Sequence, residues 1–166
     1  MLNAMRRSKQ RRQDAARIYA ALVARAREPV FFATFGVPDT LDGRFDLLTL
    51  HAWLVLERLK RDAQLSQVLI DTIFTGFDEA LREMGSGDIG MARRMKKMAD
   101  AFYGRIAAYG AALEPDGMRA ALTRNLYRGV CAPGAGAVAN YVFKAKAHLA
   151  TWEGGLPDFG PLPGEE

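Results

Sequence analysis

Apolar residues recur along most of this chain at the three-to-four-residue spacing of amphipathic helices, and no convincing run alternates as a half-buried strand does. The spacing predicts helices over residues 10–26, from about Asp46 onward, and over residues 66–84, 88–113, 115–128 and 135–152. We therefore expect an all-α fold, a single compact helical domain of about six helices.

The second predicted helix is apolar on nearly all sides, which is typical of a helix at the centre of a core. Asp46 is placed to cap its first turn. His51 lies on an apolar face, so a satisfied core histidine is favoured over a ligand. Ahead of this helix, residues 30–35 form either a short strand or a packed hydrophobic connector, and residues 36–43 form a loop.

Residues 81–105, LREMGSGDIGMARRMKKMADAFYGR, lead into a strongly amphipathic helix. Its apolar stripe consists of Met91, Met95, Met98, Phe102, Ile106, Tyr109 and Leu113. Phe102, Ile106 and Leu113 are predicted to be core residues. Two interpretations of the methionines stay open: core packing, or a flexible surface that adapts to varied apolar partners.

The glycines of the same segment have mostly local explanations. Gly85 is placed to end one helix, and Asp88 to cap the next. Gly104 lies on the polar face of the second helix, where either something approaches the backbone closely or a cost of about 0.5–1 kcal/mol is tolerated. The GSGDIG turn follows a helix and lacks the P-loop lysine, which excludes nucleotide binding of that kind.

Size and composition indicate an ordinary globular chain. Its 166 residues suit one domain, and hydrophobic residues make up 49% and charged residues 25%. No run of about 18 apolar residues is present, so we predict no transmembrane helix, and we expect no secretory signal. Cys131 is the single cysteine, which fits a reducing compartment, and we interpret it as a small residue near a helix junction rather than a reactive thiol.

Positive charge is concentrated at the start of the chain. Residues 1–28 hold eight basic and two acidic residues, a net charge of +6, whereas the whole chain carries +4. A basic arm favours an anionic partner such as membrane lipid or RNA, and a solvated, frayed terminus is the alternative. We divide the chain into a basic N-terminal arm (residues 1–12), a helical domain (13–153) and a Pro/Gly-rich flexible tail (154–166).

Signatures of catalysis and metal binding are weak. His51 and His148 lie far apart in sequence, and no HExxH, CxxC or EF-hand pattern is present. Asp39, Asp42 and Asp46 are spaced as turn and capping residues. We therefore predict no enzymatic activity, no cofactor and no metal. A helical enzyme that uses His51 with Asp42 or Asp46 is the catalytic hypothesis that remains.

Two segments together resemble the ubiquinol–cytochrome c chaperone family: residues 38–54, PDTLDGRFDLLTLHAWL, and residues 81–105. The first carries a D-G-R-F turn and a helical histidine, and the second carries M-G-x-G-D-x-G, basic residues and A-F-Y-G-R. The matching residues are Asp42, Gly43, Arg44, Phe45, His51, Met84, Gly85, Gly87, Asp88, Gly90, Arg94, Lys96, Ala101, Phe102, Tyr103, Gly104 and Arg105. The resemblance spans roughly residues 15–150.

The resemblance implies a non-enzymatic, helical assembly factor for respiratory complex III that binds the cytochrome b precursor. Family members also bind a smaller helper protein and, in mitochondria, the ribosome near its exit tunnel. The Ala/Arg/Gly-rich composition suggests a bacterial member in the cytoplasm, peripheral at the inner membrane, with the mitochondrial matrix side as the alternative. A bacterial form acts alone, as a homo-oligomer or with a helper.

The amphipathic helix supplies the predicted partner-binding residues: Met91, Arg94, Met95, Lys97, Met98, Tyr103, Gly104 and Arg105. A structural or binding role is assigned to the family-motif residues Asp42, Gly43, Arg44, Phe45, His51, Gly85, Gly87 and Asp88. The competing hypothesis is a basic helical module that binds RNA or the ribosome through the arm and the basic residues 93–97.

Overall fold

The computed structural model describes residues 1–85, 87 and 89–165, which contain seven helices and no strand. The helices are α1 (Leu2–Ala26), α2 (Pro29–Ala33), α3 (Leu41–Arg58), α4 (Ala63–Glu83), α5 (Met91–Ala111), α6 (Pro115–Asn125) and α7 (Ala135–Ala150). The expected all-α fold is confirmed; the seventh helix is the short α2.

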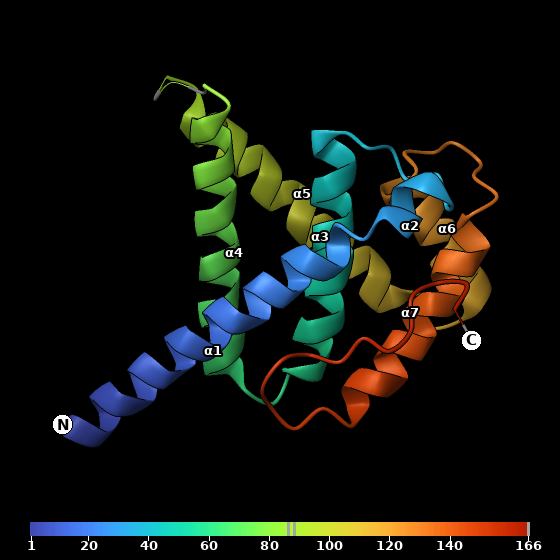
Figure 1. Ribbon diagram of the computed structural model, residues 1–166. Coiled ribbons are helices and arrows are strands. Elements are labelled where there is room, and N and C mark those ends of the chain that lie inside the picture. Colours follow the sequence, from blue (N-terminus) through green and yellow to red (C-terminus); the bar gives the residue numbers. More distant parts are fainter. Residues whose placement is uncertain (86, 88, 166) are drawn as a thin grey trace.

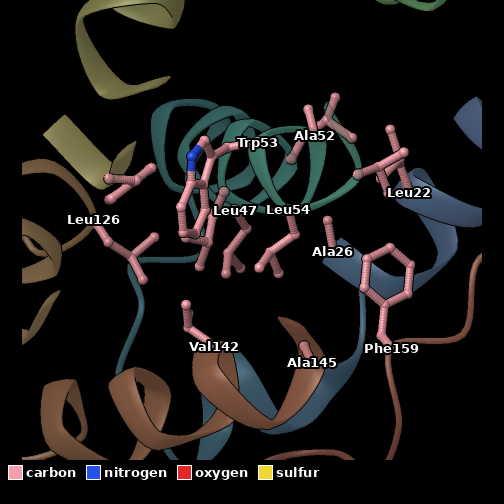
Figure 2. Close-up of a cluster of buried hydrophobic side chains, with 14 of the residues drawn as sticks. Leu22, Ala26, Leu47, Ala52, Trp53, Leu54, Leu126, Val142, Ala145 and Phe159 are labelled. Carbon is pink, nitrogen blue, oxygen red and sulfur yellow. The ribbon is translucent and has the colours of Figure 1, made fainter. Parts of the chain in front are cut away.

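Helix α3 forms the centre of the fold (Figure 1). It packs against α1, α5 and α7, while α1 also packs along α4, and α6 packs along α7. Residues 46–55 of α3 are all buried, as expected of a helix that is apolar on every side. Figure 2 shows its Trp53 and Leu54 among side chains of the surrounding helices, including Leu22 of α1 and Val142 of α7.

The start of α3 differs from the prediction. The helix begins at Leu41, where the Thr40 side chain accepts a hydrogen bond of 3.1 Å from the Gly43 amide. Asp46 is therefore not a cap: it lies in the second turn and is completely buried. Threonine in extended backbone satisfies an amide of the first turn as well as aspartate does, so the helix begins five residues earlier than predicted.

Residues 30–35 do not form a strand. Pro29 begins the short helix α2, since proline has no amide hydrogen to lose at a first helical position. The helix places Phe31 fully in the core, with its ring 5.4 Å from the His51 ring and 5.5 Å from the Tyr141 ring. The apolar run is therefore a packed helical connector.

The ends of α4 and α5 meet the predictions in part. Gly85 follows α4 in the left-handed region at φ +80°, which confirms its role in ending that helix. The predicted cap Asp88 lies outside the described residues, and α5 begins after Gly90, also left-handed at φ +94°. Leu113 was expected in the core but is 74% exposed, because α5 ends at Ala111 and the chain turns away.

The two ends of the chain are arranged differently. The first turns of α1 are exposed and project from the body of the fold (Figure 1). In the tail, Phe159 is 5% exposed and packs against His51 with a ring distance of 5.4 Å. Arg25 of α1 donates hydrogen bonds to the Gly160 and Pro161 carbonyl oxygens at 2.6 and 2.9 Å. The division into arm, domain and tail stays a prediction.

Candidate functional site

A cleft of about 500 Å³ lies between α1, α3, α4 and α5. The segment at residues 38–54 lines it with Leu41, Asp42, Arg44, Phe45 and Leu48, and the segment at residues 81–105 with Leu81, Met84, Arg94, Lys97, Met98, Ala101 and Arg105. The rest of the lining is Tyr19, Val23, Ala26, Arg27, Gly76, Phe77, Ala80 and Arg128. Two segments that are separated by residues 55–80 in the sequence therefore meet at one site.

The D-G-R-F residues form a helical turn at the start of α3 and shape one wall of this cleft. A Cβ atom on Gly43 would collide with the Pro38 carbonyl oxygen, so only glycine permits this close approach. Arg44 forms an exposed ion pair with Asp39 at 2.9 Å. The turn places the Phe45 ring 5.1 Å from the ring of Phe77 on α4, which joins the walls that α3 and α4 contribute.

Helix α5 forms a second wall, in which apolar and basic side chains share one face. The cleft-lining residues Arg94, Lys97, Met98, Ala101 and Arg105 recur every one to four positions on that face. Arg94 and Arg105 are eleven residues apart, which corresponds to about 16 Å along a helix axis. The basic side chains are therefore distributed along the cleft.

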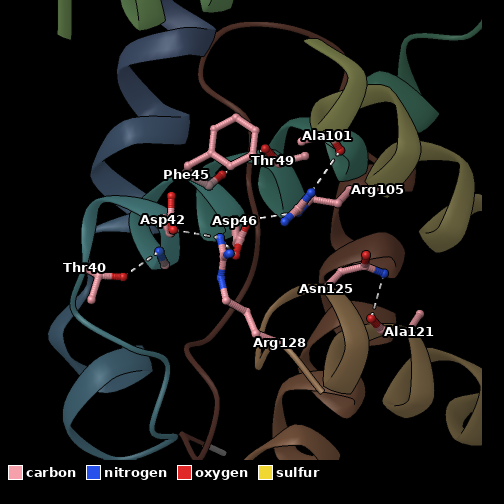
Figure 3. Close-up of polar contacts among 11 residues, drawn as sticks. Thr40, Asp42, Phe45, Asp46, Thr49, Ala101, Arg105, Ala121, Asn125 and Arg128 are labelled. Atoms are coloured by element: carbon pink, nitrogen blue, oxygen red, sulfur yellow. Dashed lines mark hydrogen bonds and ion pairs between the residues drawn. The ribbon is translucent and has the colours of Figure 1, made fainter. Parts of the chain in front are cut away.

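A cluster of buried and half-buried charges joins the two walls (Figure 3). The completely buried Asp46 lies with its Oδ1 atom 2.8 Å from Arg105 Nε, although this N–H is not aligned for a hydrogen bond. Arg128 Nη2 donates to Asp46 Oδ2 at 3.2 Å and lies 3.4 Å from Asp42 Oδ2. Arg105 also donates to the Ala101 carbonyl oxygen at 3.2 Å. The carboxylate of α3 thus holds one guanidinium from α5 and one from the loop after α6.

Burial dominates the electrostatics of Asp46. It raises the pKa of this carboxyl from 3.8 to about 6, and the neighbouring charges of Arg105 and Arg128 only partly oppose the shift. The group is still mainly ionised at neutral pH. A buried carboxylate needs both cationic partners, because removal of either leaves charge that the protein interior does not solvate.

Arg128 is held in an unusual backbone conformation. Among the described residues it is the one non-glycine residue with a positive φ, at +53°. Such a conformation costs on the order of 1–3 kcal/mol and persists only where surrounding contacts fix it. The ion pairs to Asp42 and Asp46 are such contacts. They direct the guanidinium to the edge of the cleft.

His51 is a core residue, as the sequence predicted. Its Nδ1 lies 2.8 Å from the Leu47 carbonyl oxygen and its Nε2 lies 2.9 Å from the Tyr141 hydroxyl. A carbonyl oxygen can only accept, so Nδ1 carries the proton and Nε2 accepts from the hydroxyl. Burial lowers the pKa of His51 to about 4, which keeps the ring neutral. The Tyr141 hydroxyl accepts in turn from Arg25 Nε at 3.0 Å.

The predicted partner-binding residues are not all in one place. Arg94, Lys97, Met98 and Arg105 line the cleft, whereas Met91 is buried at 6% exposure and Met95 is half-buried against the core. Tyr103 is 51% exposed and lines a separate, smaller groove with Trp53 and Phe102. Gly104 is exposed, and a Cβ there would meet nothing within 4 Å. No part of the described chain therefore approaches Gly104 closely.

Other candidates from the sequence are placed away from the cleft or at its edge. Gly85 and Gly87 are exposed and lie between α4 and α5, and Met84 lines the cleft at 60% exposure. Cys131 is exposed in the loop before α7. The sequence suggested a helix cap for Asp46, with a catalytic partner of His51 as the alternative, and it predicted no role for Arg128. Asp42 and Asp46 lie four residues apart and therefore on one face of a helix. This spacing was the signal that could have identified Asp46 as part of the site.

Residues 1–85, 87 and 89–165 contain no group of three or more His, Cys, Asp or Glu side chains arranged to hold a metal ion. Within the same residues, no helix combines the length and hydrophobicity needed to cross a membrane.

Comparison with known proteins gives consistent matches. Residues 33–154 match the family model described as ubiquinol-cytochrome C chaperone. The chain is 28% identical over 123 residues to ubiquinol-cytochrome-c reductase complex assembly factor 1 of Xenopus laevis, covering 70% of this chain and 62% of that protein. The human protein of the same name is 26% identical over 123 residues, covering 70% of this chain and 41% of the human one. The chain thus spans less than two thirds of these relatives.

A solved structure is also similar. The crystal structure of the Cbp3 homolog from Brucella abortus is 40% identical in sequence and superposes with a TM-score of 0.79. The superposition covers 90% of this chain and 88% of the Brucella chain. The helical arrangement described above is therefore shared with that protein over nearly its whole length.

Proposed function

The chain belongs to the ubiquinol–cytochrome c chaperone family, and on this basis we propose that it assists assembly of ubiquinol–cytochrome c reductase by binding newly made cytochrome b in the cleft. The observation that carries the proposal is the convergence of both motif segments on that cleft. A motif required only for folding would have no reason to place basic and apolar side chains around an open space. The proposed activity is non-enzymatic, and both ring nitrogens of His51 are already hydrogen-bonded.

The chemistry of the cleft supports an apolar client. Its lining includes the apolar side chains of Phe45, Leu48, Phe77, Leu81 and Met98. A newly made membrane protein exposes apolar segments that need cover until they insert. Methionine adapts its shape to varied apolar surfaces, so Met98 and Met84 suit a client that is held in transit.

A pull-down from the native membrane, with mass spectrometry of the captured proteins, tests this proposal. The wild-type chain should recover cytochrome b, and Met98→Glu should recover several-fold less, because a charge in the apolar lining opposes burial of the client. Leu113→Glu is the control, since Leu113 is 74% exposed beyond the end of α5 and does not line the cleft. Equal recovery by all three forms would contradict the cleft assignment.

The exposed start of α1 is proposed to contact the anionic surface of the inner membrane, on the cytoplasmic side in a bacterium. Met1, Leu2 and Met5 are largely exposed there, beside the basic side chains of Arg6 and Arg7. Apolar side chains at the end of a helix, flanked by cationic ones, suit the boundary between lipid headgroups and acyl chains. Co-sedimentation with phosphatidylglycerol vesicles should fall for Arg6→Glu with Arg7→Glu. Association of the arm with ribosomes instead would favour the RNA-binding alternative.

Assembly of the chaperone itself is a separate proposal. A bacterial member is proposed to work as a single chain or as a homo-oligomer, with a small helper protein as the third arrangement. Native mass spectrometry of the complex captured from membranes separates these cases by mass. The same measurement shows whether cytochrome b is bound to one copy or to several.

A further inference from the structure

The charge on the edge of the cleft is strongly one-sided. Six basic residues contribute to its lining, and among the residues that line it Asp42 alone is acidic. The basic residues are Arg27, Arg44, Arg94, Lys97, Arg105 and Arg128. In the described part of the chain, Lys97 and Arg27 have no ion-pair partner. The cleft is therefore suited to an anionic ligand.

The spacing of these basic residues excludes a compact anion as the best fit. Arg94, Lys97 and Arg105 extend over eleven residues of α5, about 16 Å along its axis, and the start of α3 adds Arg44 on another wall. A single phosphate contacts guanidinium groups within only a few ångströms of each other. An extended segment with several negative charges matches basic residues spread over separate walls, among which Arg44 and Arg105 already pair with Asp39 and Asp46.

The lining between these charges is apolar, which distinguishes a polypeptide from a nucleic acid. Leu81 is aliphatic, the Phe77 ring is only 5% exposed, and the Arg105 guanidinium lies over the Phe45 ring at 5.5 Å, so these side chains present no open ring face on which a base could stack. Phe45, Leu48 and Met98 lie with them in the lining. Such a surface accepts the apolar stripe of an amphipathic helix, as grooves between helices commonly do.

Within the protein, Asp42 already makes the kind of carboxylate–guanidinium contact with Arg128 that an acidic ligand would make. Asp42 Oδ2 lies 3.4 Å from Arg128 Nη2, and the two side chains are 68% and 46% exposed. An ion pair this exposed contributes little stability, so another carboxylate can take its place. Arg128 keeps its second partner, the buried Asp46, during such an exchange.

We propose that the client segment held in the cleft is an amphipathic helix whose apolar face is flanked by acidic side chains, which pair with Lys97, Arg27 and Arg128. This inference rests on the proposed function, because it specifies the chemistry of the client segment. The acidic side chains fix the orientation and register of the segment, and the apolar lining contributes burial.

Synthetic peptides test this inference with the purified full chain. Two fluorescein-labelled helical peptides of about 18 residues share one apolar stripe and differ only in carrying Glu or Gln beside it. Fluorescence anisotropy should give about tenfold tighter binding of the Glu peptide, with a difference that shrinks as salt is added. Lys97→Glu with Arg27→Glu should abolish the difference, and a peptide with Lys in place of Glu should then bind better than the Gln peptide.

The matched control changes the same charges on the outer face of α5. Arg93→Glu with Lys96→Glu should keep the preference for the Glu peptide within about twofold, because neither residue lines the cleft. Circular dichroism and thermal melts establish that both double variants are folded. All four changed side chains are exposed, so folding is expected to survive.

Three results would overturn the inference. The first is equal binding of the Glu and Gln peptides, and the second is a preference for the Glu peptide that survives in Lys97→Glu with Arg27→Glu. The third is displacement of the Glu peptide from the wild-type cleft by poly-uridine RNA or phosphatidylglycerol vesicles. Capture of cytochrome b is scored separately. If capture persists while the peptides bind equally, the charge chemistry is wrong and the proposed function stands. If the Glu peptide binds more tightly but cytochrome b is never captured, the cleft prefers acidic helices and the proposed function is wrong.

Discussion

Arg105 of α5 and Asp46 of α3 form an ion pair, with 2.8 Å between Nε and Oδ1, and the aspartate side chain is completely buried. The pair joins the two motif segments behind the cleft that both of them line. A buried ion pair is weak evidence for net stability, but loss of one partner is costly. The arrangement therefore fixes the relative position of α3 and α5.

Arg105→Ala should lower the free energy of unfolding by about 3 kcal/mol, because it leaves the buried carboxylate of Asp46 with only the more distant Arg128. Urea denaturation followed by circular dichroism measures this value. Arg44→Ala removes an ion pair in which both side chains are 58% exposed, and should cost less than about 1 kcal/mol. Equal losses for the two variants would show that the buried pair has no special role.

The pH dependence of stability should reveal two opposing groups. The pKa of Asp46 is raised from 3.8 to about 6, so in this window the folded chain binds a proton that the unfolded chain has released, and stability falls as pH rises. The pKa of His51 is lowered from 6.5 to about 4, so the unfolded chain binds the extra proton, and stability rises with pH. Each group contributes about 3 kcal/mol, so the two nearly cancel in the wild type.

Substitution should expose each contribution separately. Between about pH 4 and pH 6.5, Asp46→Asn should become more stable with rising pH relative to the wild-type profile, and His51→Gln should become less stable. Gln13→Ala, at an exposed position and with no titratable group involved, should follow the wild-type profile in parallel. The measurement is the slope of the unfolding free energy against pH for the wild type and the three variants. Parallel slopes for all four proteins would contradict the environments described for Asp46 and His51.

Two glycines should respond to alanine in opposite directions. Gly43→Ala should destabilise the fold by about 2 kcal/mol or more, because the new Cβ collides with the Pro38 carbonyl oxygen. Gly104→Ala should stabilise it by about 0.5–1 kcal/mol, since the position is helical and its surroundings are open. Thermal unfolding midpoints measure both. A Gly104→Ala variant that is stable yet captures less client would show that a partner approaches the backbone there.

Tyr141→Phe should cost about 1–3 kcal/mol, because His51 Nε2 then lacks its donor inside the core. Arg25 Nε loses its acceptor at the same time, although its Nη2 keeps the carbonyl oxygens of the tail. Tyr103→Phe, at a residue that is 51% exposed, is the matched control and should change stability by less than about 0.5 kcal/mol. Chemical denaturation of the two variants compares them directly.

The helical architecture could be predicted because burial follows periodicity. The uninterrupted apolar pattern of α3 identified the central helix. The buried face of α1 follows the three-to-four-residue spacing that predicted a helix over residues 10–26, and it consists of Ala15, Ile18, Leu22 and Ala26. Asp46 could not be placed in the same way, because an aspartate near a helix start is equally suited to a cap and to a buried ion pair. Threonine at position 40 took the capping role.

The cleft could be predicted only along α5. Helical spacing placed Arg94 and Arg105 beside the apolar stripe that contains Met98, but it assigned Lys97 to the opposite side of the helix. It also did not separate Met98 from Met91, which the fold buries. Arg128 comes from a loop 82 residues beyond its partner Asp46, and no local pattern reports a contact at that separation. The walls that α1 and α4 contribute depend likewise on tertiary packing.

Site-specific photo-crosslinking in cells tests whether newly made cytochrome b occupies the cleft. A photoreactive amino acid replaces Met98 in the cleft or Leu113, which is 74% exposed beyond the end of α5. Crosslinking during synthesis of cytochrome b should join that protein to position 98 and not to position 113, and the signal should weaken when Lys97→Glu is added. Crosslinking of cytochrome b at position 113 alone, or at neither position while the protein is bound, would contradict the account.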